Sequence, residues 1–385
     1  YCPVCGEILE RRFGVERQYY AHPKGIGDDC EVKMKLILKE NDVIFDSSEE
    51  DILANEYYNK EFKDVTVELS EYQSEEGYFL TQEQKDIIFS KEDRIKISAL
   101  AGSAKSSTLY YYAKERPYKR ILYIVYNKAM KDEAEKMFGK LSNVDIKTMH
   151  GLAYKYVGVY YKNKLTFNYN AVDVIKDLNL DWNSQQELAV KTYEMFKEYM
   201  LSDANDFEDL EIYKEDKEYR NQIVAMCNRL WELKKSYNNN IKVEHDFYLK
   251  LFQLSKKNLS NTYDIILLDE AQDSSKLILD MLINSKVKGI VIVGDKYQQL
   301  YSWRKAQDIM PLFDGVEYKL TTSFRVSQQI ANIANLIIQD CSDNEIHMKG
   351  FNVDQKIVDK IDKNKPYACL CRTNSYIFAE VIEAI

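Results

Sequence analysis

Two adjacent carboxylates, Asp269 and Glu270, follow a run of apolar residues in the C-terminal half of the chain. A buried parallel strand of this kind delivers polar side chains to the edge of a sheet, where ligands bind in open α/β folds. One carboxylate could hold Mg²⁺, and its neighbour could activate a water molecule. A second apolar run, at 289–293, also leads to an acid, Asp295. Two strands with acidic ends predict a site of nucleotide hydrolysis.

A third apolar segment, 95–100, is expected to form a strand that turns directly into a helix. The turn is similar to the P-loop pattern G-x-x-x-x-G-K-[ST], which binds phosphate through backbone N–H groups, a lysine and a hydroxyl. Alanine occupies both glycine positions, at Ala99 and Ala104, whereas Lys105 and Ser106 are retained. The segment alone fits an ordinary strand–turn–helix equally well, and the carboxylates downstream favour the nucleotide site. The expected nucleotide-binding residues of this turn are Ala101, Gly102, Ser103, Ala104, Lys105, Ser106 and Ser107.

The composition is that of a globular protein with several domains. The chain has 385 residues, of which 45% are hydrophobic and 30% charged, and such a length predicts about two or three domains. The net charge of −9 argues against non-specific coating of nucleic acid, although local patches decide where nucleic acid binds. No apolar run approaches the roughly 20 residues that span a bilayer, so we expect no membrane association.

A short module at the N-terminus has the spacing of a zinc site. Cys2 and Cys5 are separated by two residues, and His22 and Cys30 follow. Thiolates at this spacing can share one tetrahedral zinc ion, and the later pair could complete a structural Cys₃His site. The wide spacing of that pair leaves open that these are ordinary reduced cysteines and a surface histidine. The odd total of seven cysteines predicts reduced thiols in an intracellular protein.

In their order and spacing, these and further segments resemble the motifs of superfamily 1 DNA helicases of the UvrD/Rep type. The tyrosine-containing segment at Tyr126 resembles the F-box DNA helicase branch and some phage enzymes. The matching segments are Leu80–Gln84, Ala99–Ser106, Tyr126–Ala129, Thr148–Ala153, Asp269–Asp273, Gly294–Arg304, Leu320–Arg325 and Cys371–Asn374. The resemblance extends over 78–385 and leaves the preceding residues unexplained.

The resemblance implies how a nucleotide would be held. Gln84, in a segment whose Thr81 is an expected helix N-cap, would read the adenine edge, and Phe324 would stack on the base. Lys105 would bind the β- and γ-phosphates. The metal ligands would be Ser106 and Asp269, and the cofactors ATP and Mg²⁺, with a structural Zn²⁺ in the N-terminal module.

The resemblance also implies the catalytic roles. Glu270 would be the general base for the attacking water, and Gln298 would sense the γ-phosphate and link it to DNA. Arg325 would stabilise charge on the transferring phosphoryl group, and such an arginine finger contributes roughly 10³–10⁵ in rate in GTPases. Lys105 completes the expected catalytic set.

Aromatic side chains at the end of the segment Gly294–Arg304 predict a track for single-stranded DNA, since stacking on an aromatic ring is independent of base sequence. Trp303 is the main stacking candidate, followed by Tyr301, with Arg304 beside them. Further candidates for DNA contacts are Tyr126, Asn127 and His150, of which His150 could equally be a core histidine.

The implied fold is α/β: a RecA-like P-loop NTPase with a parallel sheet, an inserted helical domain, the start of a second RecA-like domain and a small N-terminal zinc module. The expected segments are a zinc module at 1–40, an acidic linker with one helix at most at 41–76, a first RecA-like domain at 77–155 and 261–315, a helical insert at 156–260, and an incomplete second RecA-like domain at 316–385.

The helical insert has two local signals of its own. Ser184 and Glu187 form the S-x-x-E pattern of a capping box. A buried helix face is predicted by the spacing of Ile223, Met226, Cys227, Leu230 and Trp231.

The predicted function is an ATP-dependent DNA helicase or translocase in which single-stranded DNA stimulates ATP hydrolysis, with 3′ to 5′ movement implied by the resemblance. The alternative is a non-hydrolysing, ATP-gated nucleic-acid-binding protein, because Ala104 departs from the motif and motifs V and VI are not seen in the chain. We therefore expect an N-terminal portion of a helicase that acts as a monomer on single-stranded DNA or a single-strand/duplex junction. Its expected location is the cytoplasm of a bacterium or a phage-infected cell.

Overall fold

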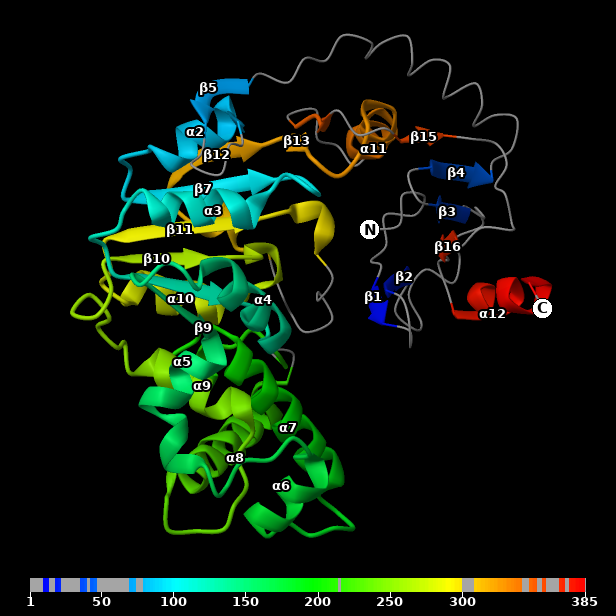
Figure 1. Ribbon diagram of the computed structural model, residues 1–385. Helices are drawn as coiled ribbons and strands as arrows, with labels where there is room; N and C mark the ends of the chain where they lie inside the picture. The colour runs from blue at the N-terminus through cyan, green and yellow to red at the C-terminus, as the bar shows by residue number, and fades with distance from the viewer. Residues whose placement is uncertain are drawn as a thin grey trace. The chain divides into compact units, whose positions relative to one another are not determined.

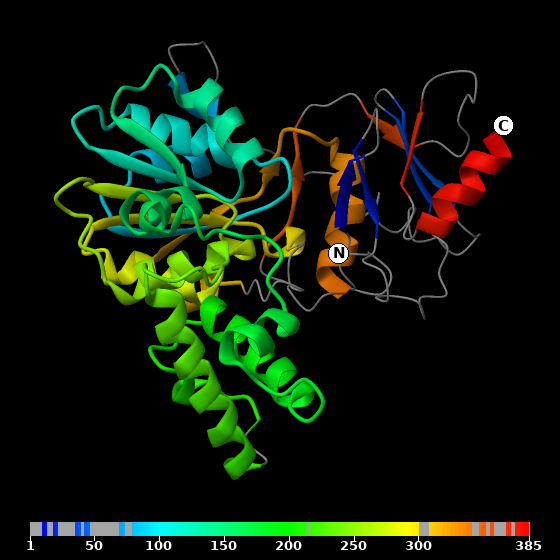
Figure 2. The ribbon, with the colours of Figure 1, turned by 90° about the horizontal axis from the view of Figure 1, so that it is seen from below.

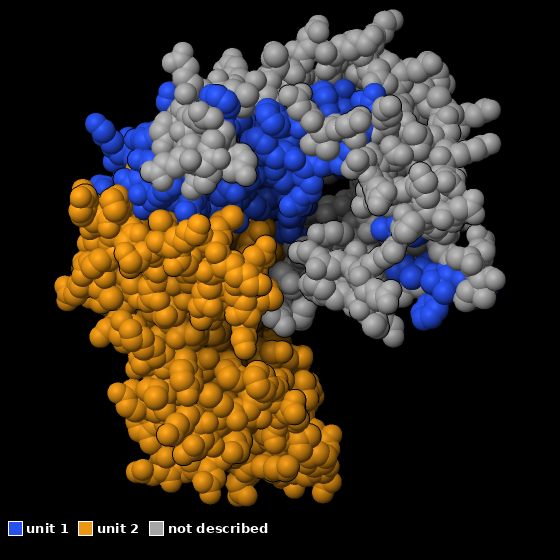
Figure 3. Space-filling model, viewed as in Figure 1, with its two compact units in different colours: residues 1–115, 293–304, 315–385 blue, residues 116–292, 305–314 orange. Residues whose placement is uncertain are grey.

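The structure, a computed structural model, describes residues 10–13, 18–21, 35–39, 42–46, 69–73, 79–213, 216–299, 308–340, 346–351, 355–357, 367–370 and 374–384. The chain divides into two compact units, coloured differently in Figure 3. Unit 1 comprises residues 1–115, 293–304 and 315–385, and unit 2 comprises 116–292 and 305–314.

A six-stranded sheet has the order β12-β7-β11-β10-β8-β9. Its strands are β7 (Arg94–Ala99), β8 (Ile121–Val125), β9 (Val144–Thr148), β10 (Ile265–Leu268), β11 (Gly289–Gly294) and β12 (Val316–Leu320). The pairs β12·β7, β11·β10, β10·β8 and β8·β9 are all parallel. Every residue of β8, β10 and β11 is buried, which is typical of parallel strands covered on both faces. The predicted α/β fold with a parallel sheet is confirmed.

Unit 2 carries the predicted helical insert. Its helices and short 3₁₀ turns are α4 (Lys128–Phe138), α5 (Met149–Tyr156), η1 (Gly158–Tyr161), α6 (Ala171–Leu178), α7 (Gln186–Leu201), η2 (Phe207–Asp209), α8 (Lys217–Lys235), α9 (His245–Leu254), η3 (Ala271–Asp273), α10 (Lys276–Asn284) and η6 (Met310–Leu312). Helices α6, α7 and α8 form a group beyond α5 and α9, seen in green in Figures 1 and 2. Aromatic rings fill the core of this group: Trp231 packs against Phe247 at 4.8 Å and against Tyr199 at 5.3 Å between ring centroids.

The predicted buried face of α8 is confirmed with one qualification. Ile223, Cys227, Leu230 and Trp231 are buried, whereas Met226 is only partly buried at the margin of the same core. Burial also raises the pKa of the Cys227 thiol well above its usual range, so this cysteine is an inert core residue.

The predicted capping box at Ser184 is wrong. Helix α7 begins at Gln186, its N-cap is Gln185, and no side chain caps it. Ser184 instead donates from its backbone and its hydroxyl to the carboxylate of Asp181. Asp181 thus holds Ser184 in the preceding turn, and the helix begins one residue later than the pattern placed it.

Unit 1 contains the elements around β7 and β12 and the C-terminal part of the chain. They are β1 (Glu10–Phe13), β2 (Gln18–Ala21), β3 (Lys35–Lys39), β4 (Asp42–Asp46), β5 (Leu69–Gln73), β6 (Phe79–Thr81), α2 (Gln82–Ile88), α3 (Lys105–Lys114), η4 (Lys296–Gln298), β13 (Thr322–Ser323), α11 (Gln328–Asp340), β14 (Lys349–Gly350), β15 (Lys356–Ile357), β16 (Tyr367–Leu370) and α12 (Asn374–Ala384). A four-stranded sheet has the order β15-β4-β3-β16. The described parts of 41–76, where at most one helix was expected, are the strands β4 and β5.

Within the described part of the chain, no helix has the length and apolar character needed to cross a membrane.

Candidate nucleotide site

The turn between β7 and α3 has the backbone of a phosphate-binding loop. Gly102 has φ +74°, and Ala104, the N-cap of α3, has φ 58° and ψ 40°, so both residues are in left-handed conformations. A Cβ on Gly102 would lie 2.6 Å from Ser323 Oγ and 2.7 Å from Arg325 Cβ, so only glycine fits there. Ala104 accepts a conformation that costs a residue with a Cβ about 1–2 kcal/mol. Such local strain is characteristic of functional turns.

Ser103 marks the inside of this turn. Its side chain is 2% exposed, and its hydroxyl has no hydrogen-bond partner among the described residues. A buried hydroxyl without a partner costs about 1–3 kcal/mol, which an oxygen of a bound phosphate would offset. Lys105 and Ser106 open the ten-residue helix α3, whose N-terminus favours an anion. The residues of the turn therefore fit a nucleotide phosphate.

Gln84 is connected to the same helix. Thr81 caps α2 as predicted and forms a capping box with Gln84, whose Oε1 accepts from the Thr81 backbone N–H at 3.1 Å. The Gln84 amide also donates to Thr108 Oγ1 of α3 at 3.1 Å. Gln84 is buried at 3% exposure, so the structure places it as a bridge between α2 and α3. Its reading of adenine stays a prediction.

Phe324 and Arg325 lie beside the phosphate-binding turn within unit 1. The Phe324 backbone N–H donates to the carbonyl of Gly102 at 2.9 Å. Arg325 is exposed, and its Cβ lies close to the Cα of Gly102. The Phe324 ring meets Phe351 edge-on with 5.1 Å between centroids. The structure thus brings the predicted site residues Phe324 and Arg325 next to Gly102, which is far from them in sequence.

Gln298 is held by the acid that ends β11. The Gln298 amide donates to Asp295 Oδ2 at 2.7 Å, and Asp295 Oδ1 caps η4 by accepting from the Tyr297 N–H at 3.0 Å. Asp295 is 1% exposed, so this arrangement is buried at its base. The second acidic strand end that the sequence indicated therefore serves to position Gln298.

The paired carboxylates follow β10 in unit 2, as predicted. Asp269 is 4% exposed, and its backbone N–H donates to Ile124 O at 3.0 Å, which continues the β10·β8 pairing. Asp269 Oδ1 accepts from the Glu270 N–H at 2.9 Å. Glu270 has φ 51° and ψ 46°, a left-handed conformation that turns the chain sharply at the strand end. Gln272 donates from its amide to Glu270 Oε2 at 2.7 Å and so orients that carboxylate.

Sequence reasoning missed two residues at this strand end. Gln272 was included only in the segment Asp269–Asp273, and Tyr123 was not among the candidates. The Tyr123 hydroxyl donates to Asp269 Oδ2 at 2.5 Å. A tyrosine inside an otherwise aliphatic run was the available signal, because a buried phenolic hydroxyl usually has a polar partner.

The predicted DNA-contacting residues that the structure describes all lie in unit 2. Asn127 is the N-cap of α4, where its side chain accepts from the Met130 N–H at 2.9 Å, and Tyr126 before it is half-buried. His150 Nε2 lies 3.0 Å from Asp246 Oδ1, with both side chains partly exposed. His150 is therefore a surface residue with a carboxylate partner, and the core alternative is wrong.

Other predicted residues lie outside the described ranges. They are Tyr301, Trp303 and Arg304 of the DNA track and Cys2, Cys5, His22 and Cys30 of the zinc module. Among the residues that the structure describes, no group of three or more His, Cys, Asp or Glu side chains could hold a metal ion.

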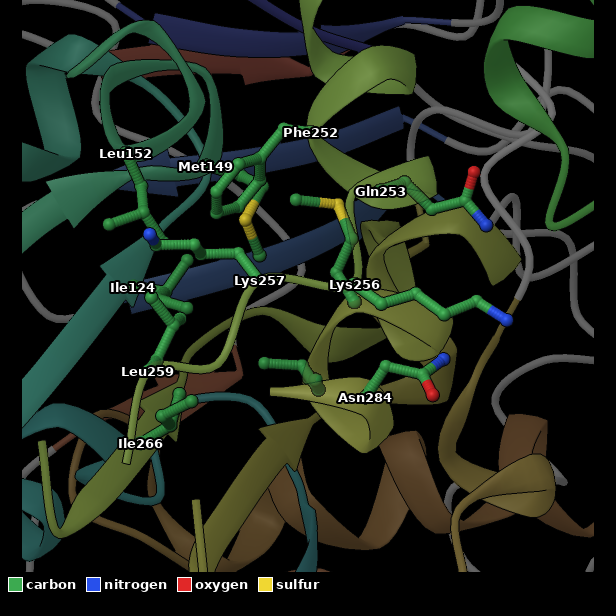
Figure 4. A pocket seen from close by; sticks show the side chains of 12 residues that line it. Ile124, Met149, Leu152, Phe252, Gln253, Lys256, Lys257, Leu259, Ile266 and Asn284 are labelled. Carbon is green, nitrogen blue, oxygen red and sulfur yellow. The ribbon is translucent and has the colours of Figure 1, made fainter. Parts of the chain in front are cut away.

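Figure 4 shows a separate hollow in unit 2. Side chains from β8, α5, α9, β10 and α10 line it, including Ile124, Met149, Phe252 and Ile266. The lining is mainly apolar, with Lys256 at its margin. None of the predicted site residues lines this hollow, so it is distinct from the carboxylates at the end of β10.

A parallel sheet with a glycine-containing turn into a helix after one strand and adjacent carboxylates after another is the arrangement found in P-loop nucleotide hydrolases. Residues 80–312 match the model of the UvrD/REP helicase N-terminal domain. The chain is 32% identical over 289 residues to F-box DNA helicase 1 of Gallus gallus, covering 68% of this chain and 28% of that protein. It is 29% identical to F-box DNA helicase protein 1 of Schizosaccharomyces pombe (75% of this chain, 36% of that protein) and 25% identical to the ATP-dependent DNA helicase PcrA of Staphylococcus aureus (69% and 40%).

The chain belongs to the UvrD/REP helicase family and contains the N-terminal domain of that family. It spans between 28% and 40% of the length of these three relatives. The relatives come from a bird, a yeast and a bacterium, so they do not support the narrower expectation of a bacterial or phage-infected cell.

Proposed function

We propose that the protein is an ATP-dependent DNA helicase or translocase whose ATP hydrolysis is stimulated by single-stranded DNA. The observation that carries this proposal is the strand end at Asp269 and Glu270, where a strained backbone and two hydrogen-bonded side chains fix adjacent carboxylates. A general base must be held in place to activate water, and a hydrogen bond from Gln272 does so for Glu270. Family membership supports the choice of nucleotide and of DNA.

The residues have distinct parts in the proposed reaction. Lys105 and the N–H groups of the turn bind the phosphates, and Arg325 offsets charge that develops on the transferred group. Ser106 and Asp269 supply hard oxygen ligands of the kind that Mg²⁺ prefers. When bound, Mg²⁺ neutralises phosphate charge and orients the terminal phosphate. Glu270 accepts the proton of the attacking water, and Gln298 connects the nucleotide state to DNA.

A lysine-rich edge of the helical insert supports the DNA part of the proposal. We define it as residues 160–168 and 235–245. The two segments lie side by side, because Val243 donates to Lys164 O at 2.9 Å and Thr166 donates to Val243 O at 3.0 Å. The Lys164 ammonium fixes the second segment by donating to Ser236 O at 2.5 Å and to Asn239 Oδ1 at 2.9 Å.

Charge and exposed rings both suit this lysine-rich edge to nucleic acid. In a chain with net charge −9, the edge contains four lysines and one acid, Glu244, which pairs with Lys234 at 2.7 Å. Three exposed aromatic side chains lie on the edge: Tyr160 at 67%, Phe167 at 88% and Tyr237 at 60% exposure. Phe167 stacks on His245 with 4.4 Å between centroids, and partial burial together with the nearby His150 lowers the pKa of His245. Basic residues among exposed rings are the usual means of holding a strand without reading its sequence.

The proposal is tested by ATP turnover of the full-length protein with and without single-stranded DNA. We expect DNA to increase turnover, and Glu270→Gln to abolish turnover while nucleotide binding is retained. Turnover that DNA does not change, or that survives Glu270→Gln, would contradict the proposal. Nucleotide-dependent DNA binding without turnover would instead support the non-hydrolysing alternative. Strand separation and its polarity are measured with duplexes that carry either a 3′ or a 5′ single-stranded tail.

The zinc module remains a separate proposal based on the spacing of Cys2, Cys5, His22 and Cys30. Metal analysis of the purified protein should find about one zinc per chain, lost on Cys2→Ser with Cys5→Ser. A protein free of zinc would remove the proposal.

A further inference from the structure

Tyr123 on β8 contacts the carboxylate that ends the neighbouring strand. Its hydroxyl donates to Asp269 Oδ2 at 2.5 Å, and the two side chains are 2% and 4% exposed. Parallel pairing of β8 with β10 sets Tyr123 opposite Leu267, two residues before Asp269. The contact is therefore fixed by the register of two buried strands.

The Tyr123 ring is fixed as firmly as its hydroxyl. Phe138 of α4, itself 1% exposed, packs against the ring with 4.5 Å between centroids and 30° between planes. A buried ring held on one side, with its hydroxyl on a carboxylate, has little freedom to rotate. The orientation of the Asp269 carboxylate is thus determined by Tyr123 on one oxygen and by the Glu270 N–H on the other.

We infer that Tyr123 is a positioning residue for the metal-binding carboxylate of the site. This inference rests on the proposed function, in which Asp269 is a ligand of Mg²⁺. An ionised carboxylate accepts at about four lone-pair sites, so a hydrogen bond from Tyr123 is compatible with a role as a metal ligand. Partners that orient metal ligands typically contribute 10–100-fold in metal affinity or activity.

A second tyrosine–aspartate pair provides a matched control. Tyr263, just before β10, donates to Asp145 Oδ2 of β9 at 2.6 Å and is 4% exposed. This pair has the same chemistry, but it lies at the opposite end of β10 from Asp269. Tyr263→Phe therefore removes a similar bond without changing the contacts of Asp269.

The test compares Tyr123→Phe with Tyr263→Phe in the full-length protein. Two quantities are measured: the Mg²⁺ concentration for half-maximal ATP turnover, and the affinity for Mn²⁺ with a non-hydrolysable ATP analogue, followed by electron paramagnetic resonance. We expect Tyr123→Phe to weaken both about tenfold and Tyr263→Phe to leave both unchanged. Adding Tyr123→Phe to Asp269→Asn should cause no further loss, because the tyrosine acts through that carboxylate.

The inference is overturned if folded Tyr123→Phe protein binds Mn²⁺ as the wild type does, or if its loss adds fully to that of Asp269→Asn. If Tyr123→Phe does not fold, Phe138→Leu, which loosens the same ring, must weaken Mn²⁺ binding for the inference to stand. If Tyr123→Phe weakens Mn²⁺ binding but the wild type does not hydrolyse ATP, only the proposed function is contradicted. If the wild type hydrolyses ATP and Tyr123→Phe changes neither the Mg²⁺ dependence of turnover nor the Mn²⁺ affinity, only this inference is contradicted.

Discussion

The backbone N–H of Phe324 donates to the carbonyl oxygen of Gly102 at 2.9 Å, which joins the segment after β13 to the phosphate-binding turn. A second bond, from Leu100 N–H to Leu320 O at 2.9 Å, extends the β12·β7 pairing up to that turn. These bonds place the backbone next to Arg325 beside the turn. In the proposed function, this attachment holds Arg325 beside the turn, where charge would develop on the transferred group.

The first prediction concerns Gly102. In Gly102→Ala, the new Cβ would overlap Ser323 Oγ and Arg325 Cβ, and φ +74° would strain the alanine backbone. We expect the free energy of unfolding to fall by about 3 kcal/mol from strain and overlap together, and ATP affinity to be lost with it. Urea unfolding and nucleotide titration measure the two effects. Gly151→Ala in α5 is the control: it should leave ATP affinity unchanged and should not lower the free energy of unfolding, because alanine is favoured over glycine inside a helix. A stable Gly102→Ala protein would show that the turn can open.

Ala104 gives a prediction of the opposite sign. Its φ of 58° is left-handed, so Ala104→Gly should raise the free energy of unfolding by about 1 kcal/mol through release of strain. Ala225→Gly on the exposed side of α8 should instead lower it by about 1 kcal/mol, as glycine does inside helices. Denaturant unfolding of both variants checks the signs. If both substitutions destabilise equally, the left-handed turn at Ala104 is not the conformation in solution.

The sequence predicted what depends on local spacing. Thr81 is the N-cap of α2, as predicted, whereas its capping box with Gln84, three residues later, was not predicted although the spacing of N-cap and N3 allows it. The strand end at Asp269 was also predicted correctly, because a continuous apolar run indicates a buried strand and the acids that follow it mark where the strand ends. The capping box at Ser184 did not form although its pattern was equally local, because the helix begins one residue later, at Gln186, and Ser184 is bound in the preceding turn.

Long-range partners could not be predicted from these patterns. Tyr123 and Asp269 are 146 positions apart, and the bond from Thr321 to Glu83 joins positions 238 apart. Such pairs depend on strand register, and a shift of one residue would turn Tyr123 to the other face of the sheet. Hydrophobic periodicity indicates that a strand is buried but not which neighbour it pairs with.

Lys250 predicts a dependence of stability on alkaline pH. Its ammonium donates to Ser202 O at 3.0 Å and to Ala204 O, and lies 4.2 Å from the centre of the Tyr199 ring. Burial lowers the pKa of Lys250 from 10.5 to about 8. Between these values the unfolded chain binds more protons than the folded protein, so this group makes the folded protein more stable as pH rises from about 8 to 10.5.

The measurement is the free energy of unfolding against pH for wild type and Lys250→Met. Wild-type stability should rise relative to the variant across that window by on the order of 3 kcal/mol. Lys197→Met, which removes an exposed lysine of α7, should leave the wild-type profile unchanged. Parallel profiles for wild type and Lys250→Met would mean that Lys250 keeps an ordinary pKa in the folded protein.

The last prediction concerns the lysine-rich edge of the helical insert. Phe167 is 88% exposed and stacked on His245, so Phe167→Ala removes a stacking surface with little effect on the core. We expect DNA affinity to weaken by about 1–3 kcal/mol, as for loss of one base–aromatic stack. Lys162→Ala should instead reduce the dependence of log affinity on log salt by about one unit, as for loss of one phosphate contact.

Trp182→Ala is the matched control, because Trp182 is a 50% exposed ring of the same unit that follows Asp181 outside the lysine-rich segments. Fluorescence anisotropy of labelled DNA over a range of salt distinguishes the two effects. If Phe167→Ala and Trp182→Ala bind DNA as the wild type does, the exposed rings of the insert do not contact DNA. If Trp182→Ala weakens binding as much as Phe167→Ala, contact is not specific to this edge, because an exposed ring beside acidic residues should not attract a polyanion.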